Sequence, residues 1–265
     1  MDGLEALRRQ AEHWLAAGDV EAACRLWQRE LALCPQRTAL MVELSYAHSH
    51  AGRYRDAMDW AIRAAQALPE DAEGRRGLIR RLKTFNEIEC LQGVARRLLA
   101  DPGTDVLLLV EAARALNLGN DFESARACLD AALARAPRHP EVRKLHAQWL
   151  VQAGELERAE ELFQQLLAET PHDAQTWWLL VRLRRQTDAP DRRDALLALL
   201  PRLAAVPQHV ALAARALHKV AHDLGEHELA WDALELMCRA KRRIEPHDPV
   251  VERRIHEALM ALPTT

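Results

Sequence analysis

Two histidines, His218 and His222, have the spacing that comes closest to a metal site. A separation of four residues places both imidazoles on one face of a helix, where they could supply two ligands to a zinc ion. No third ligand is apparent, and two ligands without a positioned third rarely hold zinc. We therefore expect no metal ion there, and we interpret His218 as a histidine packed between helices.

Signatures of catalysis and cofactor binding are missing from the sequence. There is no GxGxxG, no GxxxxGK followed by Ser or Thr, no GxSxG and no HExxH. The five cysteines are odd in number and contain no CxxC pair, which favours free thiols over a disulfide framework. We predict a protein that is not an enzyme and that carries no cofactor.

The near-equal numbers of basic and acidic residues limit the kinds of partner that we expect. The 265 residues include 36 Lys and Arg against 39 Asp and Glu, for a formal net charge of -3. This balance is unlike that of proteins whose main task is to neutralise a nucleic-acid backbone. No run of 18 apolar residues and no signal-peptide pattern occurs. We expect a cytoplasmic protein with a protein partner, and neither a nucleic-acid nor a membrane partner.

Six prolines recur at a nearly constant interval. The separations between Pro35, Pro69, Pro102, Pro137, Pro171 and Pro207 are 34, 33, 35, 34 and 36 residues. A glycine or asparagine stands 17 residues before four of them, at Gly18, Gly52, Asn120 and Gly154. This is the pattern of an internal repeat whose unit has two halves.

Both halves of each unit have the apolar spacing of a helix. In the second unit Leu40, Leu44 and Ala47 precede the turn glycine, and Ala57 and Ala61 follow it. Such intervals place side chains on one stripe of a helix, and a glycine after the first run suits a left-handed C-terminal cap. β-strand signals are absent, so we predict an all-α chain.

These features resemble the tetratricopeptide repeat (TPR) family. A small residue such as Ser45 lies seven before the turn, an alanine such as Ala57 lies five after it, and a proline closes the unit. The resemblance implies a right-handed superhelical solenoid of about seven helix-turn-helix repeats. The repeats would span residues 4–37, 38–71, 72–105, 106–139, 140–173, 174–207 and 208–242, followed by a capping helix over residues 248–261.

Three units depart from the family pattern. Asn86 replaces the turn glycine in the third unit, and residues 188–191 (Asp-Ala-Pro-Asp) form the turn of the sixth, with about two extra residues. The second helix of the seventh unit runs past the expected proline to Ile244. We expect these departures to change the local twist and not the fold.

In TPR proteins the first helix of each repeat turns one face toward a concave groove. In this chain that face is rich in cations, and its acidic residues are few, mainly Glu73 and Glu141. A concave surface reinforces the potential of such charges, so an acidic peptide is the expected ligand. The alternative is that arginine merely fills solvated helical faces. The expected groove residues are Arg76, Arg80, Lys83, Arg114, Asn117, Lys144, Gln148, Trp178, Arg182, Arg185, Arg215, Lys219 and His222.

The tryptophans divide into core and surface candidates. Trp27 and Trp177 occupy positions where the TPR family places an aromatic side chain. Trp178, one residue further on, is turned by about 100° from Trp177 and cannot share its environment. Trp178 therefore either packs in the core against other residues than Trp177 does, or it is exposed and binds a partner.

The resulting prediction is a protein–protein interaction scaffold that binds an acidic or extended peptide in a basic concave groove. An alternative comes from the C-terminal part, where Leu224-Gly225, the basic run 239–243 and His247-Asp248-Pro249 resemble the end of the TPR region in bacterial TPR-sulfotransferase fusion proteins. That resemblance implies a substrate-recruiting region of a sulfotransferase whose catalytic domain is absent from this chain.

Overall fold

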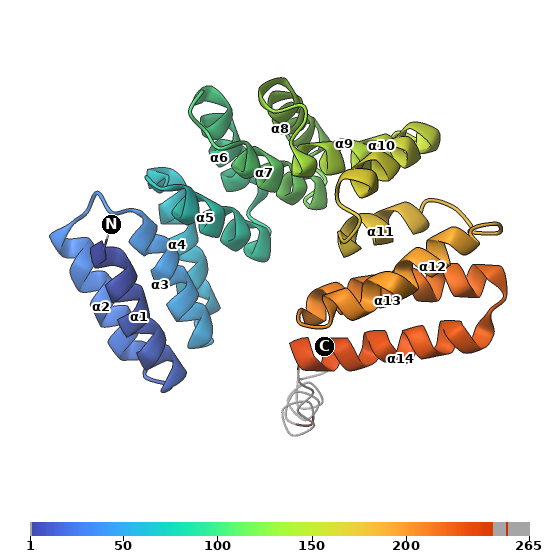
Figure 1. The fold of residues 1–265 in the computed structure, drawn as a ribbon. Coiled ribbons are helices and arrows are strands. Elements are labelled where there is room, and N and C mark those ends of the chain that lie inside the picture. Colours follow the sequence, from blue (N-terminus) through green and yellow to red (C-terminus); the bar gives the residue numbers. More distant parts are fainter. Residues whose placement is uncertain (1, 246–252, 254–265) are drawn as a thin grey trace, which may run out of the picture. The chain divides into compact units, whose positions relative to one another are not determined.

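A computed structural model describes residues 2–245 and residue 253 (Figure 1). The chain divides into two compact units, residues 1–145 and 146–265, and each is described by itself. The helix expected over residues 248–261 lies outside the described residues.

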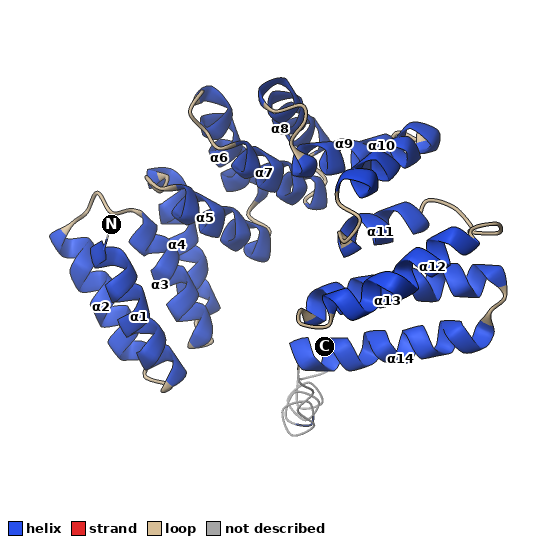
Figure 2. Ribbon diagram, viewed as in Figure 1, coloured by secondary structure: helices blue, strands red, loops and turns tan. Residues whose placement is uncertain are grey.

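Every regular element of the described residues is a helix (Figure 2), which confirms the predicted all-α class. Fourteen α-helices and one short 3-10 helix, η1, follow one another within residues 2–245. Their bounds are α1 Asp2–Ala16, α2 Val20–Leu33, α3 Ala39–His50, α4 Tyr54–Ala67, α5 Ala72–Phe85, α6 Ile88–Ala100, α7 Val106–Leu118, α8 Phe122–Arg135, α9 Pro140–Gln152, α10 Leu156–Glu169, α11 Ala174–Val181, α12 Pro190–Leu199, η1 Leu200–Leu203, α13 Pro207–Leu224 and α14 His227–Ile244.

The turns within the helix pairs have the conformation that the sequence predicts. Gly18, Gly52 and Gly154 have φ angles of 80°, 72° and 81°, and the asparagines that replace glycine, Asn86 and Asn120, have φ angles of 58° and 62°. Glycine and asparagine are the residues that enter this left-handed region most readily. The turn therefore stops the first helix of a pair and lets the second helix run back along it.

The small residues of the repeat allow the paired helices to approach closely. Ser45 and Ala113, seven residues before their turns, and Ala57 and Ala125, five after, are fully buried. Ser45 Oγ donates a hydrogen bond of 2.6 Å to the carbonyl of Ala57, so the serine in this series is paired. A larger side chain at these positions would separate the two helices.

Each unit has its own apolar core. In residues 1–145, Trp27 is 2% exposed and packs with Leu40 and Leu44 between the first two helix pairs. In residues 146–245, Phe163 is fully buried among Ala147 and neighbouring leucines, and Trp177 packs against this cluster as well as against the next one along the chain. Large apolar side chains on helices that face each other are what bind one repeat to its neighbour.

Candidate functional site

The expected groove cations of residues 1–145 are largely paired with carboxylates on the same face. Arg114 Nη2 and Lys144 Nζ each lie 2.8 Å from a carboxylate oxygen of Glu141. Arg76 Nε lies 3.0 Å from Glu111 Oε1. The two groups form an ion pair, but the angle at the N–H group is not that of a hydrogen bond. The first helices α5, α7 and α9 thus supply both partners of each pair, which neutralises much of their positive charge.

The acidic residues of this face are more numerous than the sequence analysis allowed. Besides Glu73 and Glu141, the structure places Glu43 on α3 and Glu111 on α7 beside the arginines. Burial raises the pKa of Glu111 even though Arg76, Arg80 and Arg114 oppose the shift. The expectation that acidic residues are few on the first-helix faces is therefore wrong for this unit, because cross-helix pairing brings together residues 27 to 65 positions apart.

Arg8 joins three first helices through two carboxylates. Its Nε lies 2.8 Å from Glu43 Oε1 on α3, and its Nη1 lies 2.6 Å from Glu73 Oε2 on α5. These residues border a hollow of about 530 Å³ that Glu12, Tyr46, Arg76 and Arg80 also line. Burial raises the pKa of Glu43 although Arg8 opposes the shift. The hollow has charges of both signs and is not a purely basic surface.

Two groove cations of this unit, Arg80 and Lys83, are exposed on α5. Neither has an ion-pair partner among the described residues. Asn117 on α7 is half-buried, and its Oδ1 atom has no hydrogen-bond partner among the residues that the structure describes. Exposed charge on this face is thus concentrated at α5.

One buried arginine, Arg81, could not be identified from the sequence. It is 6% exposed, its Nε donates to Ser45 Oγ at 2.9 Å, and its guanidinium lies between the rings of Tyr46 and Phe85 at 4.7 and 4.5 Å from their centres. Burial lowers the pKa of Arg81. Its role is to join α5 to α3, since hydroxyl groups and ring faces surround the charge.

Other arginines cap helices instead of lining a groove. Arg97 donates to the last carbonyls of α4, those of Ala65, Gln66 and Ala67, at 3.2, 2.9 and 3.1 Å. Arg135 does the same for α6 and the turn that follows it. A cation at a helix C-terminus satisfies free carbonyls and opposes the helix dipole. Arginines such as these therefore stabilise the helices and do not line a groove.

In residues 146–245 the expected groove residues lie on α9, α11 and α13 and on one loop. Gln148 is half-buried on α9. The sequence predicts that Arg182 and Arg185 lie on a first helix, but α11 ends at Val181, so this prediction is wrong. Arg182 follows directly as the C-cap, and Arg185 lies in the loop before α12.

Gln186 explains why α11 ends early. It is 2% exposed, and its Nε2 donates to the carbonyls of Val181 and Arg184 at 3.2 and 3.0 Å. Its backbone N donates to Asp223 Oδ2 on α13 at 2.8 Å, and its Oε1 accepts from Arg192 at 2.6 Å. These bonds replace the helical ones and fix the loop that carries Arg182 and Arg185.

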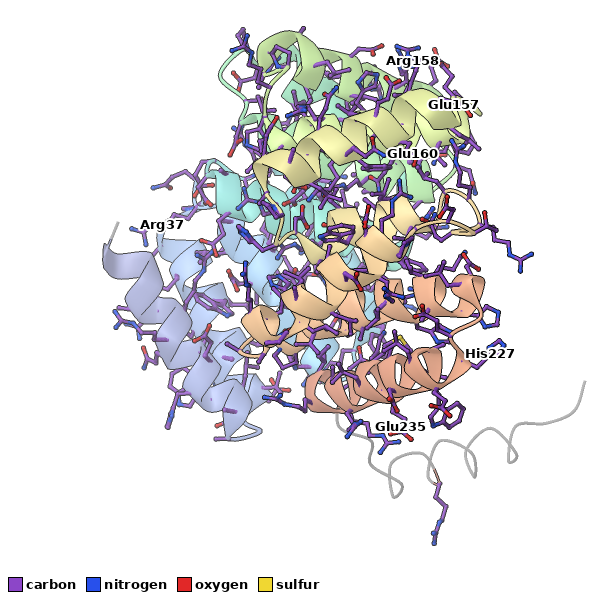
Figure 3. All side chains as sticks on the ribbon, turned by 45° about the vertical axis from the view of Figure 1, so that its right-hand side comes forward. Arg37, Glu157, Arg158, Glu160, His227 and Glu235 are labelled. Carbon is purple, nitrogen blue, oxygen red and sulfur yellow. The ribbon has the colours of Figure 1, made fainter. Side chains whose placement is uncertain are left out.

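A second set of contacts holds this loop against the neighbouring helix. Arg184 and Arg192 both reach Glu160 on α10, at 3.0 and 2.5 Å, and Arg184 also reaches Glu157 at 3.3 Å. Figure 3 labels both glutamates on α10. Arg184 and Arg192 are thus neutralised, whereas Arg182 and Arg185 are exposed and have no ion-pair partner within the described residues.

Trp178 and Arg215 form a stacked pair between α11 and α13. The guanidinium carbon of Arg215 lies 4.0 Å from the centre of the Trp178 ring, and the half-buried indole packs against the core of this unit. Trp178 is therefore in part a core side chain, and Arg215 covers the rest of its ring. Stacking uses the face of the guanidinium and leaves its in-plane N–H groups available to an acceptor.

The remaining expected groove residues on α13 are Lys219 and His222. Lys219 hydrogen-bonds to Asp223, one turn further along the same helix. Burial alone would raise the pKa of Asp223, but hydrogen bonds from Lys219 and from the backbone of Gln186 outweigh it and hold this pKa below its usual value. Asp223 is thus the carboxylate that compensates charge on this face.

His218 lies where the sequence analysis expected it, between two helices. Its Nδ1 lies 2.9 Å from the carbonyl of Ala230 on α14, and its ring is stacked at 6.1 Å from that of the exposed His222. His227 is a third imidazole, 6.1 Å from His222. Within the part of the chain that the structure describes, no group of three or more His, Cys, Asp or Glu side chains is arranged to hold a metal ion.

The regular pairing of helices, the left-handed turns and the buried small residues agree with a comparison against protein families. A tetratricopeptide repeat family matches residues 109–174 and 144–205. Over residues 109–205 the chain is therefore similar to tetratricopeptide repeat proteins. The matched residues cover the fourth to sixth TPR units, and the same turn geometry occurs in the first, second and third.

A solved structure of a TPR protein shares the fold. A tetratricopeptide repeat protein from Parabacteroides merdae has a TM-score of 0.54 at 15% identity, covering 91% of this chain and 100% of that one. The C-terminal part of a TPR repeat-containing protein from Cytophaga hutchinsonii has a TM-score of 0.47 at 12% identity, covering 97% and 99%. No curated protein matches the chain significantly. The resemblance to TPR-sulfotransferase fusion proteins stays a prediction.

The sequence predicts no membrane partner for these helices. None of those described is both long enough and apolar enough to cross a membrane.

Proposed function

We propose that the chain is a protein-interaction scaffold and that an acidic segment of a partner protein binds to exposed cations on α13 and on the loop that follows α11. TPR arrays present extended surfaces to partners because each repeat contacts mainly its neighbours and leaves one face uncovered. The observation that carries the proposal is the exposed charge of Arg182, Arg185 and Arg215, which have no ion-pair partner within residues 146–245, whereas the nearby Asp223 already pairs with Lys219.

The charges of residues 1–145 support a subsidiary role for that unit. There Arg76, Arg114 and Lys144 already hold carboxylates, which a ligand would have to displace. Breaking such a pair leaves a half-buried charge without a partner, and that loss offsets much of the gain from a new contact. Of the expected groove cations in this unit, Arg80 and Lys83 are exposed and have no ion-pair partner among the described residues, so the acidic segment binds chiefly in residues 146–245.

Charge reversal tests this proposal. Replacing Arg182 and Arg215 by glutamate removes two attractions and adds two repulsions. At about 0.5–1 kcal/mol for each of these four changes, the affinity for a fluorescein-labelled glutamate-rich peptide should fall by roughly 30- to 700-fold. The matched control is Arg29→Glu with Arg242→Glu, two exposed arginines on the second helices α2 and α14. Equal losses in both double variants would show only a general charge effect and would contradict the proposal.

A further inference from the structure

A hollow of about 520 Å³ lies beside Arg215, between the first half of α13 and the second half of α14. Its walls include the half-buried side chains of Leu212, Met237 and Ile244, which belong to or pack against the core of this unit. Gln208, Ala211, Arg215 and Lys241 complete the lining. The hollow is large enough for one bulky apolar side chain.

The charges at this hollow all have one sign. Arg215 comes from α13 and Lys241 from the last turn of α14, both are exposed, and none of the lining residues is acidic. The hollow on the other face of α14 differs, because Glu235, labelled in Figure 3, lines it and accepts a hydrogen bond of 3.0 Å from Trp231. The hollow beside Arg215 thus has apolar walls between two cations that have no ion-pair partner among residues 2–245, and the hollow on the other face of α14 does not.

Arg215 is held in a position from which it can bind a carboxylate. Its stacking on Trp178 at 4.0 Å restricts the side chain, and the rotamer freedom lost on binding an anion is correspondingly smaller. The in-plane N–H groups of a stacked guanidinium match the two oxygens of a carboxylate. Trp178 and Arg215 therefore place a restrained cation directly beside the apolar hollow.

From these contacts we infer that the hollow takes a bulky apolar side chain of the acidic segment, while carboxylates next to that side chain bind Arg215 and Lys241. This inference rests on the proposed function and names its partner more closely: an acidic segment of another protein with one large apolar residue among its carboxylates. The occupant is chosen by charge complementarity, since apolar burial alone would fit any hydrophobic chain. A purely acidic segment would bind the cations and leave the hollow solvated.

Two labelled peptides with the same net charge test the inference on the full chain. One has a phenylalanine between two pairs of glutamates, and the other has serine in its place. Burying an apolar ring in the hollow should make the phenylalanine peptide bind about tenfold more tightly. Equal affinities would overturn the inference, because the hollow would then be left to the chain's own residues 246–265 or to a second copy of the chain.

Two matched variants separate the hollow from the charges. Gln208 is exposed in the first turn of α13, so Gln208→Trp should fill the hollow without disturbing the core, and should remove the tenfold preference while the serine peptide binds as before. Lys241→Glu should weaken both peptides, whereas Arg242→Glu, at the same helix end but lining the hollow of the opposite face, should not.

The outcomes also separate this inference from the proposed function. If Arg182→Glu with Arg215→Glu weakens both peptides but Gln208→Trp changes neither affinity, the acidic surface stands and the apolar hollow is refuted. If Gln208→Trp instead changes the sedimentation coefficient to that of another oligomeric state, the hollow is an interface between copies, and the inference is equally refuted.

Discussion

Replacing Gln186 should lower both the stability of residues 146–245 and their affinity for an acidic peptide. Its buried amide replaces the helical hydrogen bonds that α11 lacks after Val181, and it orients the loop with Arg182 and Arg185. Gln186→Ala removes all three side-chain hydrogen bonds at once. The loop should then become mobile, and the two arginines should lose their fixed position.

The size of the effect follows from the contacts. Two bonds join the amide to carbonyl oxygens, at 3.2 and 3.0 Å, and each contributes about 1 kcal/mol net. The third, at 2.6 Å from Arg192, has a charged donor and contributes about 1.5–3 kcal/mol. Arg192 keeps its contact with Glu160, which reduces the loss. We expect Gln186→Ala to lower the free energy of unfolding by about 3 kcal/mol.

Urea unfolding followed by circular dichroism measures that loss, and amide hydrogen exchange of residues 182–189 locates it. The control is Thr187→Ala, a truncation of the exposed neighbouring side chain. Affinity for the glutamate-rich peptide should fall with Gln186→Ala and not with Thr187→Ala. A stability within about 0.5 kcal/mol of the unchanged chain, together with unchanged exchange in the loop, would refute the assigned role of Gln186.

Three further predictions concern single positions. Gly154→Ala should cost about 1–2 kcal/mol in urea unfolding, because φ is +81° while open space surrounds the site; an unchanged midpoint would contradict this. Burial raises the pKa of Cys128 to about 11, so mass spectrometry after iodoacetamide treatment near pH 8 should find the exposed Cys238 modified and Cys128 intact; early labelling of Cys128 would show that it is accessible. Burial alone would raise the pKa of Glu141, but hydrogen bonds from Lys144 and Arg114 hold it below its usual value. The stability this carboxylate contributes is present above the unfolded-state pKa of 4.5 and is lost as the pH falls through the lower folded value, so stability should depend less on acid pH in Glu141→Gln, and an equal pH dependence of both chains would disprove the shift.

The fold followed from the sequence because its determinants are local and repeated. The turn residues from Gly18 to Gly154 recur at a fixed distance from a proline, and every one of them has a positive φ. The buried small residues, such as Ser45 and Ala57, recur with the same period. A feature present in several units can be recognised even where one unit departs from it, as Asn86 does.

The site was only partly predictable because its charges are decided by contacts across repeats. The spacing placed Arg114 on the right face, but nothing local showed that Glu141 would bind it at 2.8 Å. The same applies to Gln186, whose buried amide ends α11, and to Arg97, which caps a helix of the preceding repeat. The spacing of residues along the sequence shows which side of a helix a cation occupies. It does not show which carboxylate neutralises that cation.

The central claim, that exposed cations of this scaffold bind an acidic segment, is tested most directly by calorimetric titration of the full chain with a glutamate-rich and a lysine-rich peptide of equal length. At low salt the glutamate-rich peptide should bind and the lysine-rich peptide should not. Raising the ionic strength to about 0.15 M, where the Debye length is about 8 Å, should weaken the binding measurably. Equal affinity for both peptides, or an affinity for the acidic peptide that does not change with salt, would contradict the account.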